Sequence, residues 1–174
     1  ALGAKVALVG RKPEKLDKVR EEIAAACGGA NSAGGAATIH ACDIREEEQV
    51  CATVDAILAA HGRIDGLVNN AGGQFPAPLR DISLKGWEAV VRTNLTGGFL
   101  VARECYRRWM EKHGGAIVNM SADMWGGMPG MAHSGAARAG MVNFTESAAC
   151  EWAASGVRVN AVAPGWIASS GFET

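Results

Sequence analysis

Short apolar runs alternate with segments of helical periodicity along the chain. Residues 5–9 form an apolar, β-branched run that predicts a strand, and Pro13 suits the first turn of a helix in which Leu16, Val19 and Ile23 recur at helical spacing. The alternation continues: strands are expected at 37–42, 64–68, 116–120 and 157–162, and helices from 43–46 to Gly62, from Ser83 to Lys112 and over 135–155.

This order of elements predicts a doubly wound α/β fold. Strands that are apolar on both faces, each followed by an amphipathic helix, indicate a parallel sheet covered on both sides and joined by right-handed crossovers. Such sheets bind ligands at the carboxyl ends of their strands. We therefore expect the function at residues 10–11, 42–43, 69–72, 120–123 and 163–166.

The length of 174 residues, 48% of them hydrophobic, favours a single domain over residues 1–174. A dinucleotide-binding domain ordinarily opens with a strand and a Gly-rich turn that holds the pyrophosphate, but this chain has no Gly-x-Gly. Residues 1–4 resemble the end of a helix, and the chain stops soon after its last expected strand. We expect the middle of a larger domain, without the first strand and its Gly-rich turn and without the C-terminal part.

Charge and cysteine content narrow the possible partners. With 17 basic and 18 acidic residues, the net charge of −1 provides no field for nucleic acid or an anionic membrane surface. No apolar run approaches the roughly 18 residues of a membrane span. The five cysteines are scattered without metal-ligand spacing, so no metal site is expected. These features predict a cytoplasmic protein that acts on a small molecule.

Five short blocks resemble the short-chain dehydrogenase/reductase family. They occur in the family's order and spacing and comprise Asn69-Asn70-Ala71-Gly72-Gly73, Asn94-Leu95-Thr96-Gly97, residues 117–121, residues 136–140 and residues 158–165. Within the family, the chain is nearest to peroxisomal trans-2-enoyl-CoA reductases, 2,4-dienoyl-CoA reductases and bacterial citronellol/citronellal dehydrogenases. The resemblance implies a Rossmann-like fold and a nicotinamide cofactor.

Arg11 and Lys12 favour NADP(H) as that cofactor. They follow the strand after which an NAD enzyme places an acidic residue for the ribose 2′-hydroxyl, and cations there suit a 2′-phosphate. The alternative is a pair of solvated cations before a helix, and NAD(H) stays possible. The resemblance also implies a larger set of cofactor-binding residues: Asp43 and Ile44 at the adenine, Asn70, Ala71 and Gly72 at the adenosine ribose, and Arg138, Pro164, Gly165 and Ile167.

The family's usual catalytic set, an Asn, a Ser and a Tyr four residues before a Lys, is largely replaced here. Asn94 matches, whereas Ser134 stands at the tyrosine position and Arg138 at the lysine position. The usual serine position falls on Ala122, directly after Ser121. His133 precedes Ser134 and either donates a proton or is a loop residue fixed by hydrogen bonds. The candidate catalytic residues are Asn94, Ser121, His133, Ser134 and Arg138.

These replacements favour one reaction over another. Carbonyl reduction leaves an alkoxide that needs an acid at once, and neither an arginine nor an isolated serine supplies one. Reduction of a C=C bond conjugated to a thioester leaves an enolate, which hydrogen-bond donors stabilise while water returns a proton to carbon. We therefore expect an NADPH-dependent reductase of α,β-unsaturated acyl-CoA. The alternatives are an alcohol or aldehyde dehydrogenase of an acyclic terpenoid, and a dinucleotide-binding protein without turnover.

Two groups of apolar side chains bear on substrate and assembly. Met120, Met124, Met128 and Met131, with Trp125 and Trp166, follow the expected strand ends and either line a site for a flexible acyl or isoprenoid chain or fill the core. The helices after Asn94 and Gly135 correspond to those that pair subunits in the family. They carry Phe99, Trp109, Phe144 and Trp152, so a homodimer or homotetramer is expected.

Overall fold

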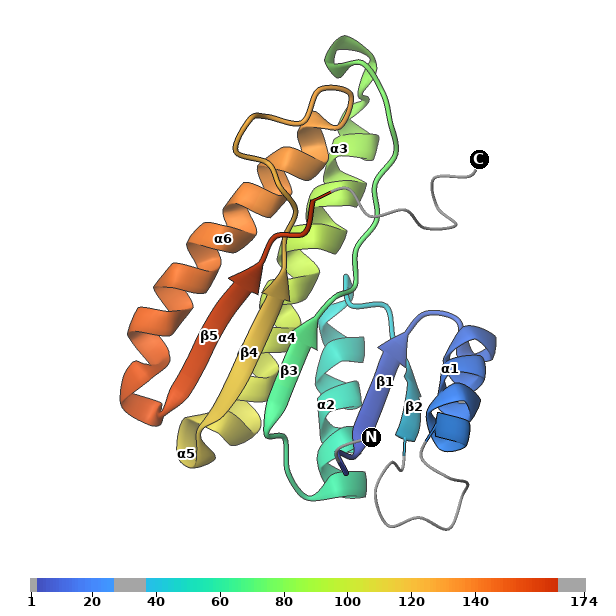
Figure 1. Ribbon diagram of the computed structural model, residues 1–174, viewed down its shortest axis with the longest axis vertical. Helices are drawn as coiled ribbons and strands as arrows, with labels where there is room; N and C mark the ends of the chain where they lie inside the picture. Colours follow the sequence, from blue (N-terminus) through green and yellow to red (C-terminus); the bar gives the residue numbers. More distant parts are fainter. Residues whose placement is uncertain (1–2, 27–36, 166–174) are drawn as a thin grey trace. The chain divides into compact units, whose positions relative to one another are not determined.

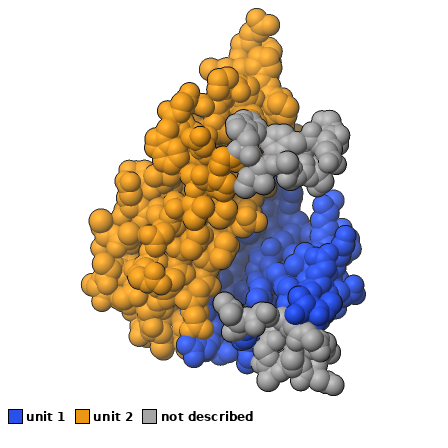
Figure 2. Space-filling model, viewed as in Figure 1, with its two compact units in different colours: residues 1–64 blue, residues 65–174 orange. Residues whose placement is uncertain are grey.

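A computed structural model of the chain describes residues 3–26 and 37–165. The chain divides into two compact units, residues 1–64 and residues 65–174 (Figure 2). Trp166 and Ile167, which the sequence analysis predicts near the substrate and the cofactor, lie outside the described residues.

The described residues of unit 1 form two parallel strands and two helices (Figure 1). In chain order these are β1 (Val6–Gly10), α1 (Pro13–Ala26), β2 (Ala37–Ala41) and α2 (Glu47–His61). The strands pair from Val6 opposite Ala37 to Gly10 opposite Ala41. Because the pairing is parallel and in step, the segments that follow the two strands begin at the same edge of the sheet.

Up to Gly165, where the described part of unit 2 ends, three parallel strands pair in the order β3-β4-β5: β3 (Gly66–Asn69), β4 (Gly115–Met120) and β5 (Val157–Val162). Its helices are α3 (Leu84–Val91), α4 (Gly97–Cys105), α5 (Glu111–His113) and α6 (Ala132–Trp152). π-Helical turns at Arg92–Thr96 and Tyr106–Met110 join α3, α4 and α5 into one long helical segment, and 3₁₀ turns occupy Leu79–Asp81 and Ala153–Ser155. The α/β class and the parallel pairing predicted from the sequence are confirmed.

A buried chain of amides joins the sheet of unit 2 to its helices. The Asn69 side chain donates to the Gly98 carbonyl at 3.0 Å and to Asn119 Oδ1 at 2.9 Å, and Asn119 donates in turn to the Thr145 hydroxyl at 2.9 Å. Asn119 is fully buried and so needs such partners. Since Gly98 lies on α4 and Thr145 on α6, both helices cover the same face of this sheet.

Two helices begin at places other than those expected. Residues 43–46 form a turn before α2 rather than its first residues, because the Asp43 carboxylate accepts from the Arg45 backbone N–H at 3.1 Å and holds the chain out of the helix. In contrast, α6 begins at Ala132, three residues before the expected start. The Met131 carbonyl already accepts from the N–H groups of Ser134 and Gly135, so this turn is helical.

Within the described ranges, no helix combines the length and the apolar character that crossing a bilayer would require.

Candidate functional site

Asn94 is positioned by the π-helical turn that separates α3 from α4. Its Oδ1 accepts from the Gly73 N–H at 2.9 Å, and its Nδ2 donates to the Gly73 carbonyl at 2.8 Å. The wider turn places this buried side chain beside the loop that follows β3. Asn94 therefore fixes the backbone of that loop through both of its amide atoms.

Arg138 lies against the same loop from helix α6. A Cβ atom added at Gly72 would lie 2.6 Å from Nη2 of Arg138 and 2.8 Å from Oδ1 of Asn94, so a side chain there would displace one or both of these groups. Nη1 of Arg138 donates to the Met120 carbonyl at the end of β4, at 2.5 Å. The structure thus brings together Asn94, Gly72 and Arg138.

The Arg138 guanidinium retains capacity for a further hydrogen bond. Its Nε is buried and has no partner among the described residues. Burial lowers the pKa of Arg138, but the guanidinium of an arginine stays charged at neutral pH. A fixed positive charge with a free donor is suited to holding hydroxyl groups or a developing anion, and it cannot relay protons.

Ser134 is fully buried in the first turn of α6. Its hydroxyl donates to Oε1 of Gln74 at 2.7 Å. Gln74 itself is exposed and follows the Gly72-Gly73 turn directly. With its oxygen held by Ser134, the Gln74 side chain has its NH₂ group left as a donor. The group at the family's tyrosine position therefore orients an amide.

His133 corrects the expectation of a loop residue fixed by hydrogen bonds. It lies in the first turn of α6, is fully buried, and neither ring nitrogen has a hydrogen-bond partner among the described residues. Its ring meets the Phe75 ring edge to face, with centroids 4.5 Å apart. Two neighbouring contacts therefore join α6 to the loop after β3: His133 contacts Phe75, and Ser134 contacts Gln74.

Ser121 helps to position helix α6. It is buried, and its hydroxyl donates to the Arg138 carbonyl at 3.2 Å. Its N–H donates to the Val162 carbonyl at 2.8 Å, which extends the pairing of β4 with β5. Because the hydroxyl is engaged with the helix backbone, Ser121 supports the turn that carries Arg138.

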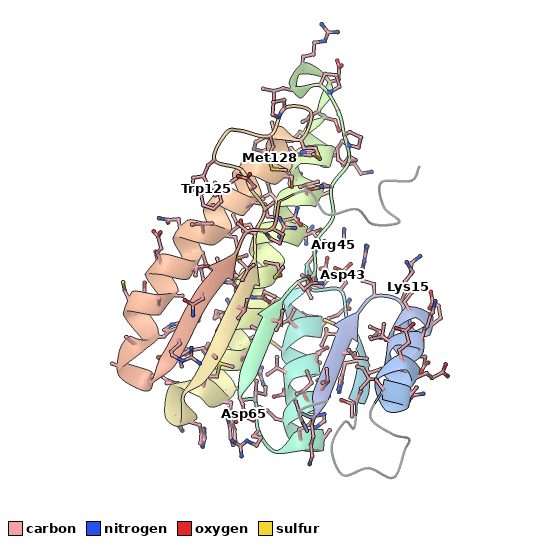
Figure 3. The ribbon with its side chains drawn as sticks, viewed as in Figure 1. Lys15, Asp43, Arg45, Asp65, Trp125 and Met128 are labelled. Atoms are coloured by element: carbon pink, nitrogen blue, oxygen red, sulfur yellow. The ribbon has the colours of Figure 1, made fainter. Side chains whose placement is uncertain are left out.

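The loop before α6 carries exposed apolar groups. Trp125 is 68% exposed, whereas Met128 is half-buried and packs against Gly135 (Figure 3). The Gly130 carbonyl accepts from the Ala77 N–H at 2.8 Å, which joins this loop to the one after β3. Leu79 and Leu84, 66% and 72% exposed, lie on the segment that follows Ala77. Wide apolar area is therefore available in these loops of unit 2.

In unit 1, the charged residues after the two strands are brought together. Arg11 and Lys12 are exposed and follow β1, and Asp43 follows β2 close enough for Arg11 to help lower its pKa. The main partner of Asp43 is Arg45, whose guanidinium Nε donates to Asp43 Oδ1 at 2.8 Å (Figure 3). This pairing brings the pKa of Asp43 to about 2. The carboxylate is therefore ionised throughout the neutral range, with the cationic side chains of Arg45 and Arg11 near it.

The other residues named from the sequence make fewer contacts. Asn70 and Ala71 are exposed after β3, and Ile44 is half-buried in the turn before α2. The Pro164 carbonyl accepts from the Asp123 N–H at 3.2 Å, so the segments after β4 and β5 run together up to exposed Gly165. No three residues of metal-binding type gather anywhere in the described ranges.

Sequence reasoning missed Gln74 and Arg45 as site residues. Both are polar and lie within a few residues of a strand end, which is the signal that could have identified them. The partners of these two residues could not be identified from the sequence. Ser134, the partner of Gln74, lies 60 residues away, and Arg45 pairs with Asp43 of its own loop.

Comparisons with known proteins identify relatives of this chain. The model of the family described as short chain dehydrogenase matches residues 1–174. A Bacillus subtilis (strain 168) protein named "Probable 2,4-dienoyl-CoA reductase" is 35% identical over 173 residues, which cover 98% of this chain and 65% of that protein. A Gluconobacter oxydans (strain 621H) glucose 1-dehydrogenase is 40% identical over 95% of this chain and 60% of its own length.

A solved structure titled citronellol catabolism dehydrogenase, from Pseudomonas aeruginosa PAO1, is 64% identical with a TM-score of 0.89. The match covers 97% of this chain and 66% of that one. The chain thus spans less than two thirds of the length of these relatives. Its blocks of sequence, its parallel α/β fold and these matches lead to one conclusion: the chain belongs to the short-chain dehydrogenase family.

Proposed function

We propose that this protein is an NADP(H)-dependent reductase of the C=C bond of an α,β-unsaturated acyl-CoA. The observation that carries the proposal is the hydrogen bond from Ser134 to Gln74. A buried hydroxyl that already donates to an amide is a poor source of the proton that an alkoxide requires. The site therefore suits a reaction whose first product is an enolate.

The groups around Ser134 match the needs of an enolate. The NH₂ end of Gln74 donates a hydrogen bond to the substrate oxygen, and the Arg138 charge favours the negative charge that develops there. The carbon next to the thioester then takes its proton from water or from the His133 imidazole. Ser134 acts here as a positioning residue, because it holds Gln74 by its oxygen.

NADP(H), when bound, supplies the hydride that adds to the β-carbon. The residues present fit this cofactor: a side chain at Gly72 would displace Arg138 or Asn94, and Arg138 keeps a buried donor without a partner among the described residues. In unit 1, exposed Arg11 and Lys12 suit the 2′-phosphate. Asn70, Ala71, Asp43, Ile44, Pro164, Gly165 and Ile167 complete the proposed cofactor-binding set.

The comparisons support the reaction class and also a second candidate. Likeness to a dienoyl-CoA reductase favours reduction of a C=C bond conjugated to a thioester. The 64% identity to the citronellol catabolism dehydrogenase favours an acyclic terpenoid alcohol or aldehyde instead. Both candidates fit the exposed apolar side chains of Trp125, Leu79 and Leu84.

One assay separates these candidates. The complete protein is given NADPH with an enoyl-CoA, a dienoyl-CoA and citronellal in parallel, and we expect turnover of a CoA thioester. Ser134→Ala should lower kcat/KM for that substrate roughly five- to tenfold, the worth of one neutral hydrogen bond. Ser147→Ala, an exposed serine of α6, is the matched control. Preference for citronellal would favour the second candidate, and cofactor binding without turnover would favour a non-catalytic role.

Cofactor choice gives a further prediction. Arg11→Asp should weaken NADPH binding roughly 10- to 100-fold, since a charge-assisted contact of about 1.5 to 3 kcal/mol becomes a repulsion. NADH binding should change less. Titration of the complete protein with both cofactors measures this, with Lys18→Asp on the exposed side of α1 as the control. An unchanged preference for NADPH over NADH would remove Arg11 from the site.

We also propose that α4 and α6 pair subunits. Phe99 and Phe144 meet edge to face across these helices, Phe144 meets Trp152 likewise, and the Arg103 guanidinium lies 5.2 Å from the Phe99 ring centroid. Phe99 nevertheless stays 37% exposed. Trp109, also expected in this surface, stacks on His113 of its own helical segment.

Phe99→Glu should therefore shift the complete protein from a dimer or tetramer towards monomers, because it places a charge in an apolar contact. Light scattering at micromolar concentration measures the mass. Val19→Glu on α1, at a similarly exposed position, should leave the mass unchanged. A monomeric parent protein would contradict the assembly.

A further inference from the structure

Two histidines of unit 1 converge on one hydroxyl group. His40 lies on β2 and His61 closes the last turn of α2. Thr38 Oγ1 lies 2.9 Å from Nε2 of His40 and 2.8 Å from Nε2 of His61. The two ring nitrogens can therefore be no farther apart than the sum of these two lengths.

The Thr38 hydroxyl can engage the two rings in different ways. It has a single proton, so it can donate to at most one imidazole, while its two lone pairs can accept an N–H from either ring. In the arrangement in which it donates to one ring, the Nε2 of that ring directs a lone pair at the hydroxyl. A shift of the other ring's proton to Nδ1 would direct both lone pairs there.

We propose that His40 and His61 bind a divalent transition-metal ion, such as Zn²⁺ or Ni²⁺, through their Nε2 atoms. Neutral imidazole is a preferred ligand of these ions, at about 2.0 to 2.1 Å for zinc. The Thr38 hydroxyl, which now lies between the nitrogens, either turns away or stays as a weak oxygen ligand. Water completes the coordination.

The surroundings of the pair favour this role. All three side chains are half-buried, so an ion can reach them from solvent. The two ligands come from a strand and a helix, and such elements hold a site more precisely than loops do.

Metal binding would fasten β2 to the end of α2. Because the unfolded chain separates the two histidines by 20 residues, the ion binds the folded state preferentially and should raise its stability. Two protein ligands make a weaker site than the usual three or four. Mg²⁺, which prefers oxygen ligands, should have no such effect.

The test uses the complete protein after treatment with a chelator, without cofactor or substrate. Titration calorimetry with Zn²⁺ and Ni²⁺ should give one ion per chain, and the same ions should raise the melting temperature. His40→Gln and His61→Gln should each weaken binding roughly tenfold or more, since one of two ligands is lost. His113→Gln, which alters an exposed histidine of unit 2, should bind as the parent does.

Further variants separate ligation from hydrogen bonding. Thr38→Val removes the shared hydroxyl but neither nitrogen, so it should keep most of the metal binding. If the three residues only tie the strand to the helix, Thr38→Val lowers the melting temperature and metal ions do not raise that of the parent. Equal binding in the parent, His40→Gln and His61→Gln would assign the ions to the cysteines, which these variants retain, and would overturn the proposal.

Discussion

Replacing Arg138 by alanine should lower kcat/KM for the best acyl-CoA substrate roughly 10- to 100-fold. The loss corresponds to one charged hydrogen-bonding group, about 1.5 to 3 kcal/mol. Its guanidinium contacts the Met120 carbonyl, lies against Gly72 and keeps one buried donor free, so it is placed to hold the cofactor ribose and to favour a nearby anion. Initial rates at several substrate concentrations measure the effect.

Two variants make this result specific. Arg138→Lys should recover much of the activity, because a lysine keeps the charge and stands at this position elsewhere in the family. Arg158→Ala removes an exposed arginine of β5 and should leave kcat/KM unchanged. Parental turnover by Arg138→Ala would limit this residue to a structural contact. Recovery of activity in Arg138→Lys would instead show that the positive charge matters more than the shape of the guanidinium.

His133→Leu should change stability and activity in opposite directions. Neither nitrogen of the buried His133 ring has a partner among the described residues, which carries a desolvation cost of about 1 to 3 kcal/mol for each such group, and leucine removes both. The lost edge-to-face contact with Phe75 offsets about 0.5 to 1.5 kcal/mol of this gain. We expect a higher melting temperature, together with a fall in kcat/KM of roughly tenfold or more if His133 donates a proton.

Opposite changes in melting temperature and in kcat/KM distinguish a functional histidine from a packing residue. If His133 only fills space against Phe75, leucine leaves turnover at the parental level. Phe75→Leu is the matched control, since it removes the ring contact and keeps the imidazole. Melting is read without substrate, so this stability result stands whichever substrate the protein reduces. Lower stability together with full activity in His133→Leu would exclude the catalytic assignment.

The sequence by itself determined the class of fold and the family. Strand-like and helical periodicities alternate along the chain because each element must bury one of its sides. Which side is buried is set by the spacing of apolar residues within the element, so it can be read from the local sequence. The ends of the strands, where Arg11, Asp43, Gly72 and Met120 lie, could be located for the same reason. Asn94 and Arg138 could be named because their blocks have the family's spacing.

Only the tertiary structure decided which of these groups are engaged and which are free. Ser121 donates to the helix backbone, Ser134 holds Gln74, and the nitrogens of His133 have no partner among the described residues. Local patterns cannot show this, because a hydrogen bond depends on where residues distant in sequence are placed by the packing of helices on strands. The same holds for His40 and His61, which approach one another only because the end of α2 lies over β2.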